Sequence, residues 1–289
     1  MSVVTAGGSN AVVFPTRRWA WTAGVSSPAH STLPAATLFP SATSTRTVVL
    51  ESVVSIPRAT RGCKAPAPTG MPRVCSGRDC SIGDGIVLCV GDSFTLGGDY
   101  NAALRAKHDG VPLPGSYPAA LKELLWAGGM RMQVLSFGYW GMPADDMAEW
   151  LPNVLRSAAS QGRISCVVIL AGANDIMKGY SPARILANLT RLHDIAASVP
   201  GAPHVVVLTI PPVPAFRARY SMAFSQGREA VNAGLCVASK GKLLVDLNVG
   251  DTTLQQPNGL NAKDGVHFTA RGNVELARAV FAGLKARFR

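Results

Sequence analysis

The sequence lacks any long apolar run, although 47% of its 289 residues are hydrophobic. A membrane-spanning helix needs about 18 or more consecutive apolar residues, so we expect no transmembrane segment. Acidic residues are also scarce, with 17 Asp and Glu against 28 Lys and Arg. The composition predicts a soluble globular protein with enough apolar residues for a sizeable core.

The net charge of +11 is unevenly distributed and does not indicate a nucleic-acid partner. Residues 1–80 contain eight basic and two acidic residues, which leaves 20 basic and 15 acidic residues in the rest of the chain. A nucleic-acid interface needs basic residues gathered on one face, with aromatic residues among them. The basic residues after position 80 are scattered, so we expect no nucleic acid to bind.

The six cysteines do not have the spacing of a zinc ribbon, and no histidine lies near those of the N-terminal part. Cys89 and Cys166 lie in apolar runs of strand character and Cys236 in a helical stretch, which favours buried free thiols for all three. The other three cysteines lie in the irregular N-terminal part: Cys63, Cys75 and Cys80. A disulfide among these is an open alternative.

Residues 1–84 show little periodicity and are rich in Ser, Thr, Ala, Pro and Gly. Frequent basic and rare acidic residues are typical of an organelle transit peptide, which favours a plastid or a mitochondrion as the location. A disordered extension of a cytoplasmic protein and a secreted protein are the alternatives. We expect no packed domain before residue 85.

From residue 85 to residue 289, strand-like and helix-like segments alternate. The expected strands are Ile86–Val90, Met132–Phe137, Cys166–Ala171, Val205–Ile210 and Leu243–Leu247. The expected helices are Tyr117–Trp126, Ala144–Ser160, Pro182–Ser198, Ser221–Ser239 and Ala270–Phe288. This alternation predicts one α/β domain over 85–289, a three-layer α/β/α sandwich with a five-stranded parallel sheet.

Ser93 is the candidate nucleophile. It follows the first strand in Gly91-Asp-Ser-Phe-Thr, and the carboxyl ends of parallel strands are where such folds place their chemistry. The connection from Thr95 to Ser116 is longer than usual and rich in Gly and Pro. It forms either a wall or lid of the site or a passive surface insertion.

A serine nucleophile needs a base, a group that orients the base, and donors for the oxyanion. Of the five histidines, His267 alone lies between the last strand and the last helix, and Asp264 precedes it by three residues. A carboxylate there can fix the imidazole tautomer. Gly141, after the second strand, can present an N–H, and Asn174, after the third, can present a side-chain amide.

Together these segments resemble the SGNH hydrolases, also called the GDSL lipase/esterase family. The resemblance covers residues 86–289 and implies a flavodoxin-like fold with Ser93 as nucleophile, His267 as base and Asp264 as orienting carboxylate. It also implies an oxyanion hole formed by the Ser93 and Gly141 N–H groups and the Asn174 side chain. Phe94 replaces the leucine of the family name, and Ser136 stands where an asparagine is frequent.

The resulting prediction is a serine esterase or thioesterase that forms a covalent acyl-enzyme and needs no metal or other cofactor. Its substrate is a small-molecule or lipid ester, and a carbohydrate O-acetyl esterase is an alternative on the same site. Two further alternatives come from other classes. One is a flavodoxin-like nucleotide-binding module with a phosphate at Ser93, Thr95, Gly97 and Gly98. The other is a metal-dependent phosphoesterase with Asp92, Asp175, Asp264 and His267 as ligands.

Overall fold

The computed structural model describes residues 85–97, 110–201, 203–247, 264 and 266–287. All of these belong to one unit of the chain, residues 58–289. The predicted transit peptide or disordered extension over 1–84 lies outside the described residues, as does most of the long connection after Thr95. Both of these interpretations stay predictions.

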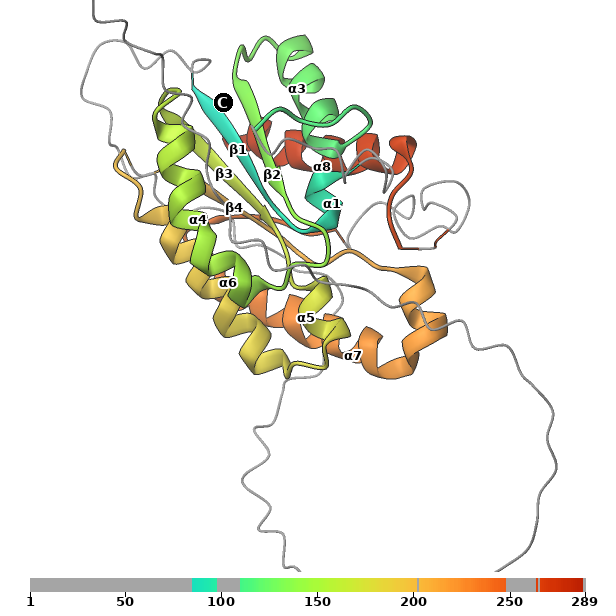
Figure 1. Cartoon of the computed structure of the whole chain (residues 1–289). Coiled ribbons are helices and arrows are strands. Elements are labelled where there is room, and N and C mark those ends of the chain that lie inside the picture. Colours follow the sequence, from blue (N-terminus) through green and yellow to red (C-terminus); the bar gives the residue numbers. More distant parts are fainter. Residues whose placement is uncertain (1–84, 98–109, 202, 248–263, 265, 288–289) are drawn as a thin grey trace, which may run out of the picture. The chain divides into compact units, whose positions relative to one another are not determined.

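Five parallel strands form one sheet at the centre of the fold (Figure 1). They are β1 (Ile86–Gly91), β2 (Gln133–Gly138), β3 (Ile164–Leu170), β4 (His204–Leu208) and β5 (Leu243–Val245). Their order across the sheet is β2-β1-β3-β4-β5. This is the flavodoxin-like order, in which the chain moves to opposite sides of β1 and leaves a crevice at the carboxyl end of that strand.

Helices cover both faces of the sheet, which confirms the predicted three-layer α/β/α fold (Figure 1). On one face α3 (Tyr117–Ala127) packs against α8 (Ala270–Arg287). On the other face α6 (Pro182–Ala197) packs between α4 (Ala144–Ala159) and α7 (Pro214–Ala238). None of the helices in the described ranges is long and apolar enough to span a membrane.

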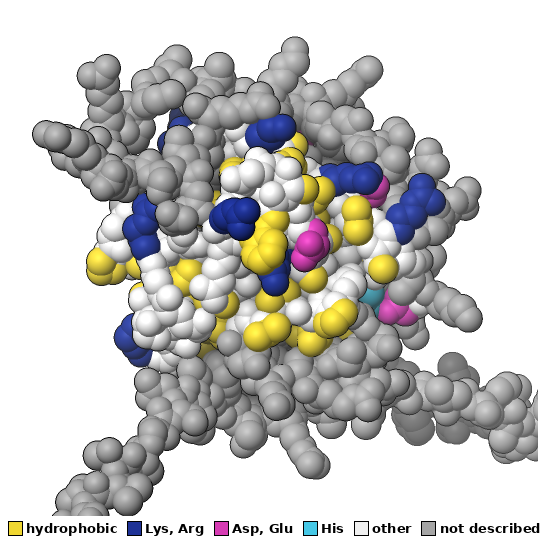
Figure 2. All heavy atoms as spheres, turned by 90° about the horizontal axis from the view of Figure 1, so that it is seen from above, with side chains coloured by type: hydrophobic (Ala, Val, Ile, Leu, Met, Phe, Trp, Pro, Cys, Tyr) yellow, Lys and Arg dark blue, Asp and Glu magenta, His cyan; other side chains and the backbone are white. Residues whose placement is uncertain are grey.

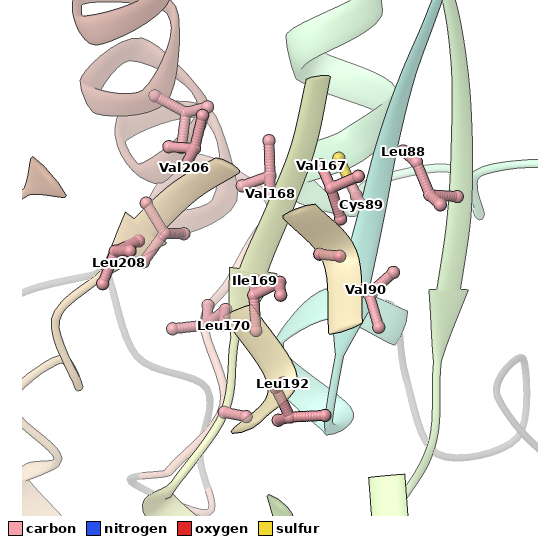
Figure 3. Close-up of a cluster of buried hydrophobic side chains, with 14 of the residues drawn as sticks. Leu88, Cys89, Val90, Val167, Val168, Ile169, Leu170, Leu192, Val206 and Leu208 are labelled. Carbon is pink, nitrogen blue, oxygen red and sulfur yellow. The ribbon is translucent and has the colours of Figure 1, made fainter. Parts of the chain in front are cut away.

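The core consists of side chains from both faces of the sheet, as the apolar runs predict. Leu88 and Val90 of β1 and Val167 and Ile169 of β3 are all 1% exposed or less (Figure 3). A parallel sheet covered on two faces buries successive residues of each strand, so its central strands are continuously hydrophobic. β1 lies between β2 and β3, so the carboxyl end of this strand, and Ser93 after it, lie at the carboxyl edge of the sheet with a neighbouring strand on either side.

The structure differs from the expected elements at three places. Two short helices were not predicted, α1 (Ser93–Leu96) and α5 (Ala173–Met177), because four or five residues are too few to show helical periodicity. Helix α7 begins at Pro214, seven residues before the expected start. Cys236 on this helix is disulfide-bonded, so the expectation of a free thiol there is wrong, whereas Cys89 and Cys166 are buried and free.

Basic side chains do not gather into a stripe on the face of the molecule seen in Figure 2. Lys and Arg lie apart from one another among hydrophobic and acidic side chains. A surface that tracks a phosphate backbone requires contiguous positive charge. Among the described residues seen on this face, the basic side chains form no continuous track.

Gly138 lets α1 approach the end of β2 closely. A Cβ atom on Gly138 would lie 2.1 Å from the backbone nitrogen of Leu96 and 2.6 Å from its Cα. Backbone atoms cannot rotate away as the end of a side chain can. The turn that carries Ser93 therefore depends on the absence of a side chain at residue 138.

We predict that Gly138→Ala destabilises the fold by about 1–3 kcal/mol, the usual cost of forcing an extra group into a packed region. Urea unfolding of the variant measures this change. Gly227→Ala is the matched control, because its Cβ would meet only the Ile176 side chain at 3.5 Å and alanine favours the interior of α7. Equal stability of the two variants would contradict the proposed close approach.

Candidate active site

Ser93 opens a single helical turn directly after β1. Asp92 caps this turn, α1, and its Oδ1 accepts a hydrogen bond from the Phe94 N–H at 3.0 Å. Aspartate favours such positions because its carboxylate satisfies an N–H that has no partner in the first helical turn. This cap fixes Ser93, which is 8% exposed, at the carboxyl edge of the sheet.

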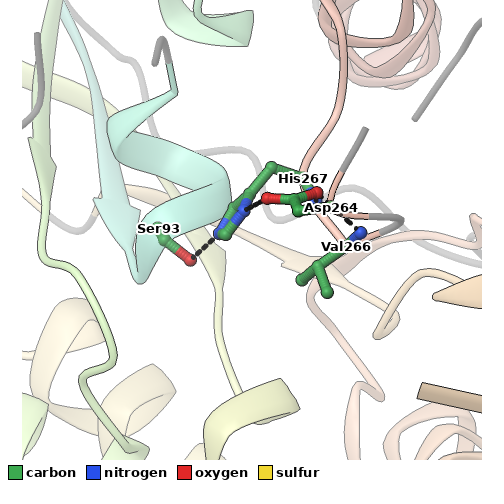
Figure 4. A network of polar contacts seen from close by, with 4 residues as sticks. All are labelled: Ser93, Asp264, Val266 and His267. Atoms are coloured by element: carbon green, nitrogen blue, oxygen red, sulfur yellow. Dashed lines mark hydrogen bonds and ion pairs between the residues drawn. The ribbon is translucent and has the colours of Figure 1, made fainter. Parts of the chain in front are cut away.

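The structure brings the side chains of Ser93, His267 and Asp264 into one chain of hydrogen bonds (Figure 4). His267 Nε2 lies 3.0 Å from Ser93 Oγ, and His267 Nδ1 lies 2.6 Å from Asp264 Oδ2. Both distances are within hydrogen-bond range. The three residues come from two connections that are far apart in the sequence, so the fold of the sheet brings them together.

Asp264 is held in its ionised form by several donors. Its Oδ1 accepts the N–H groups of Val266 at 2.9 Å and of His267 at 3.0 Å. Partial burial acts to raise the pKa of this carboxyl group, but the hydrogen bonds from the His267 ring and from the two N–H groups outweigh it and lower the pKa. An ionised carboxylate at Nδ1 directs the free lone pair of the imidazole toward Ser93.

Two other described histidines lie away from Ser93. His193 is buried on α6, and burial lowers its pKa to about 4. His204 begins β4, at the opposite end of the strand from the carboxyl edge. His30 and His108 lie outside the described residues. Among the described histidines, only His267 contacts the candidate nucleophile.

The loop between β2 and α4, which contains Gly141, is attached at both ends. The Tyr139 N–H donates to the Gly91 carbonyl at 3.1 Å, and the Ala144 N–H donates to Asp175 Oδ2 at 2.9 Å. Gly141 has φ +68°, a left-handed conformation that favours glycine. Within the described part of the chain, the N–H groups of Ser93 and Gly141 donate to no protein acceptor.

Asn174 is the second residue of α5 and contacts both neighbouring connections. Its Nδ2 donates to the Met142 carbonyl at 3.2 Å and to Asp92 Oδ2 at 3.3 Å. A side-chain amide has only two N–H bonds, so both are occupied inside the protein. To act as an oxyanion donor, the amide must share or exchange one of these partners. The sequence alone does not show that Met142 and Asp92 compete with an oxyanion for this amide.

Asp92 is buried completely beneath these groups. Burial raises its pKa to about 7, although the hydrogen bond from the Phe94 N–H acts to lower it. The nearby carboxylate of Asp175, whose own pKa burial also raises, contributes in the same direction. Asp92 therefore serves as a cap and a partner of Asn174, and it does not contact His267 in the hydrogen-bond network of the described residues.

The ligand sets of the two alternative classes are not assembled. Within the described ranges, no three His, Cys, Asp or Glu side chains converge to hold a metal ion. Thr95 is completely buried, so its hydroxyl does not face a ligand at the surface, and Gly98 lies outside the described residues. The described residues favour neither the metal site nor the phosphate site.

The model of the GDSL-like lipase/acylhydrolase family matches residues 89–274, which is more than half of the chain. The chain belongs to this family. The match spans the five candidate site residues, which are Ser93, Gly141, Asn174, Asp264 and His267. The protein is a hydrolase of ester bonds. No individually curated protein sequence matches the chain significantly.

Solved structures share the fold of this GDSL-like hydrolase. A lipase/acylhydrolase from Enterococcus faecalis is 20% identical, with 70% of this chain and 96% of that chain covered and a TM-score of 0.52. TesA is 26% identical, with 70% and 98% covered and a TM-score of 0.50. Est24, a carbohydrate acetylesterase from Sinorhizobium meliloti, is 21% identical, with 70% and 99% covered and a TM-score of 0.52. The similarity extends over almost the whole length of each of these proteins.

We predict that Asp92 makes this hydrolase less stable as the pH rises from about 4 to 7. An aspartate of the unfolded chain releases its proton near pH 4, whereas the folded chain retains the proton of Asp92 up to a pKa of about 7. Across this interval the folded state binds more protons, so the free energy of unfolding falls.

Asp92→Asn removes this titration and should reduce the decline. Urea unfolding of both proteins at pH 4.5, 6.0 and 7.5 tests the prediction, because Asp264 titrates in both proteins and its effect cancels in the comparison. The same slope of stability against pH in the two proteins would contradict it.

Proposed function

We propose that this GDSL-like hydrolase cleaves carboxylic esters or thioesters through a covalent acyl-enzyme formed on Ser93. The observation that carries this proposal is the continuous chain of hydrogen bonds from Ser93 Oγ through His267 to Asp264. A serine, an imidazole and a carboxylate at hydrogen-bond distance, in this order, form the arrangement of a nucleophile, a base and an orienting group.

In the first half of the reaction, His267 Nε2 takes the proton of the Ser93 hydroxyl as Oγ attacks the carbonyl carbon of the ester. Asp264 stabilises the positive charge that forms on the imidazole. When the tetrahedral intermediate collapses, the same proton passes from Nε2 to the leaving alkoxide or thiolate. The acyl group stays on Ser93 Oγ.

In the second half, water enters the place of the leaving group. His267 Nε2 takes a proton from this water as it attacks the acyl carbon. When the second tetrahedral intermediate collapses, Nε2 returns this proton to Ser93 Oγ and the carboxylic acid leaves. In both halves, the proposed oxyanion donors are the N–H groups of Ser93 and Gly141 and the Asn174 amide. Donors that are already in place at the developing charge supply much of the rate enhancement of such enzymes.

We expect Ser93→Ala to abolish ester hydrolysis, because no other hydroxyl is positioned against His267 in the described residues. The measurement is the release of product from a short-chain nitrophenyl ester, with circular dichroism to show that the variant folds. Ser160→Ala, an exposed serine at the end of α4, is the matched control and should keep full activity. Normal turnover by Ser93→Ala would overturn the proposed mechanism.

Asn174→Ala should lower kcat by about 10²–10³, the usual loss for one oxyanion donor, while KM changes little. A group that acts only in the transition state affects kcat and kcat/KM alike. Steady-state kinetics on the same ester separate the two constants. A variant with unchanged kcat and a raised KM would assign Asn174 to substrate binding instead.

A panel of esters addresses the substrate class. It varies the acyl chain from acetyl to long-chain fatty acyl and includes thioesters and acetylated sugars, each measured with Ser93→Ala as the blank. Preference for acetylated sugars would favour the carbohydrate O-acetyl esterase alternative over a lipid or short-chain esterase.

A further inference from the structure

An exposed tryptophan lies against the imidazole of the proposed base. The rings of Trp140 and His267 have centroids 4.4 Å apart and planes inclined by 30°. Trp140 is 38% exposed, whereas only 18% of the His267 side chain is exposed. The indole therefore covers part of the imidazole and presents surface of its own to solvent.

The other aromatic residues of this region occupy different places. Phe94 lies 6.0 Å from the His267 ring and 5.4 Å from that of Phe268, but it is 4% exposed and belongs to the core. Tyr139 packs on Trp150 with ring centroids 4.7 Å apart. Of these residues, Trp140 alone combines contact with the imidazole and a large exposed surface.

The backbone holds Trp140 in this position. The preceding residue, Tyr139, donates its N–H to Gly91, and the carbonyl of Met142 accepts from the Asn174 amide. Trp140 thus stands in a short loop that is tied to the ends of β1 and α5. It also directly precedes Gly141, so one loop carries both a proposed oxyanion donor and the ring that contacts the base.

Proton transfer places the leaving group beside this indole. His267 Nε2 must reach the leaving oxygen in the same way as it reaches Ser93 Oγ, at about 3 Å. The alcohol portion of the ester therefore lies next to the imidazole, whereas the acyl portion stays bonded to Ser93. An aromatic side chain that flanks the imidazole can contact the alcohol portion directly, and such ring contacts favour offset-stacked or edge-to-face geometry.

We propose that Trp140 is a specificity-determining residue that selects esters whose alcohol portion carries an apolar ring. This inference rests on the proposed function, because it requires His267 to protonate the leaving group. Trp140 acts on the leaving group and leaves the preference for acyl chains unchanged.

The test compares three esters that separate the two portions of the substrate. Benzyl acetate and ethyl acetate share the acyl group and differ in the alcohol, whereas ethyl butyrate and ethyl acetate share the alcohol and differ in the acyl group. The proteins are the wild type, Trp140→Leu and Trp140→Phe. The matched control is Trp126→Leu, since Trp126 is 53% exposed and donates its Nε1–H to the Met132 carbonyl, near the amino end of β2.

We expect Trp140→Leu to lower the ratio of kcat/KM for benzyl acetate over ethyl acetate by about 3- to 10-fold, in line with the strength of one aromatic stacking contact. The ratio for ethyl butyrate over ethyl acetate should not change. Trp140→Phe, which keeps a ring, should restore most of the lost ratio, and Trp126→Leu should behave as the wild type.

Three results would overturn the inference: an equal loss on all three esters, a change that follows the acyl chain, or a Trp140→Phe variant no better than Trp140→Leu. In each of these cases the wild type still hydrolyses the esters and Ser93→Ala does not, so the proposed function stands. Failure of the proposed function has a different signature, which is hydrolysis that persists in Ser93→Ala.

Discussion

The buried carboxylate of Asp92 connects the parts of the protein from which the site is built. It caps α1 by accepting a hydrogen bond from the Phe94 N–H, and it accepts a second hydrogen bond from the side-chain amide of Asn174 in α5. The backbone N–H of Asp92 also donates to the Leu170 carbonyl at the end of β3. Asn174 then reaches the Met142 carbonyl in the loop after β2. One side chain and its partner thus tie together the connections that follow β1, β2 and β3.

This arrangement has an energetic cost, because a carboxylate loses its hydration when it is buried. The cost is visible in the pKa of Asp92, which burial raises to about 7. The hydrogen bonds from Phe94 and Asn174 offset part of it. In return, the hydrogen bonds of Asp92 fix the positions of the turn that carries Ser93 and of the Asn174 amide.

The order of strands and helices was predictable because it rests on hydrophobic patterning. The apolar run of β1 and the one-sided apolar pattern of α6 define where these elements lie to within one residue at either end. The proximity of Ser93 to His267 could also be predicted, because the carboxyl ends of parallel strands lie at one edge of the sheet. Each of these inferences needs only the periodicity of the chain and the topology of a parallel sheet.

The local geometry of the site was not predictable in the same way. The four residues of α1 are defined by one capping carboxylate and by the close approach at Gly138, neither of which leaves a periodic signal. The engagement of both N–H bonds of Asn174 depends on atoms from three connections. The contact of Trp140 with His267 joins loops that are remote in sequence. Such features follow from tertiary packing, which a single sequence does not specify.

The two aspartates of the site show how environment separates groups of the same chemistry. Asp264 is about half exposed and accepts hydrogen bonds from two backbone N–H groups and from the His267 ring. These bonds lower its pKa, so the carboxylate stays ionised beside the proposed base. Asp92 is fully buried, and burial raises its pKa to about 7, so it keeps its proton to a higher pH than Asp264 does. In the proposed mechanism, negative charge is needed at Asp264, where an imidazolium forms, and is unfavourable near Asn174, where an oxyanion forms. The placement of one carboxyl group near solvent and the other in the core shifts the two pKa values in the directions that these requirements favour.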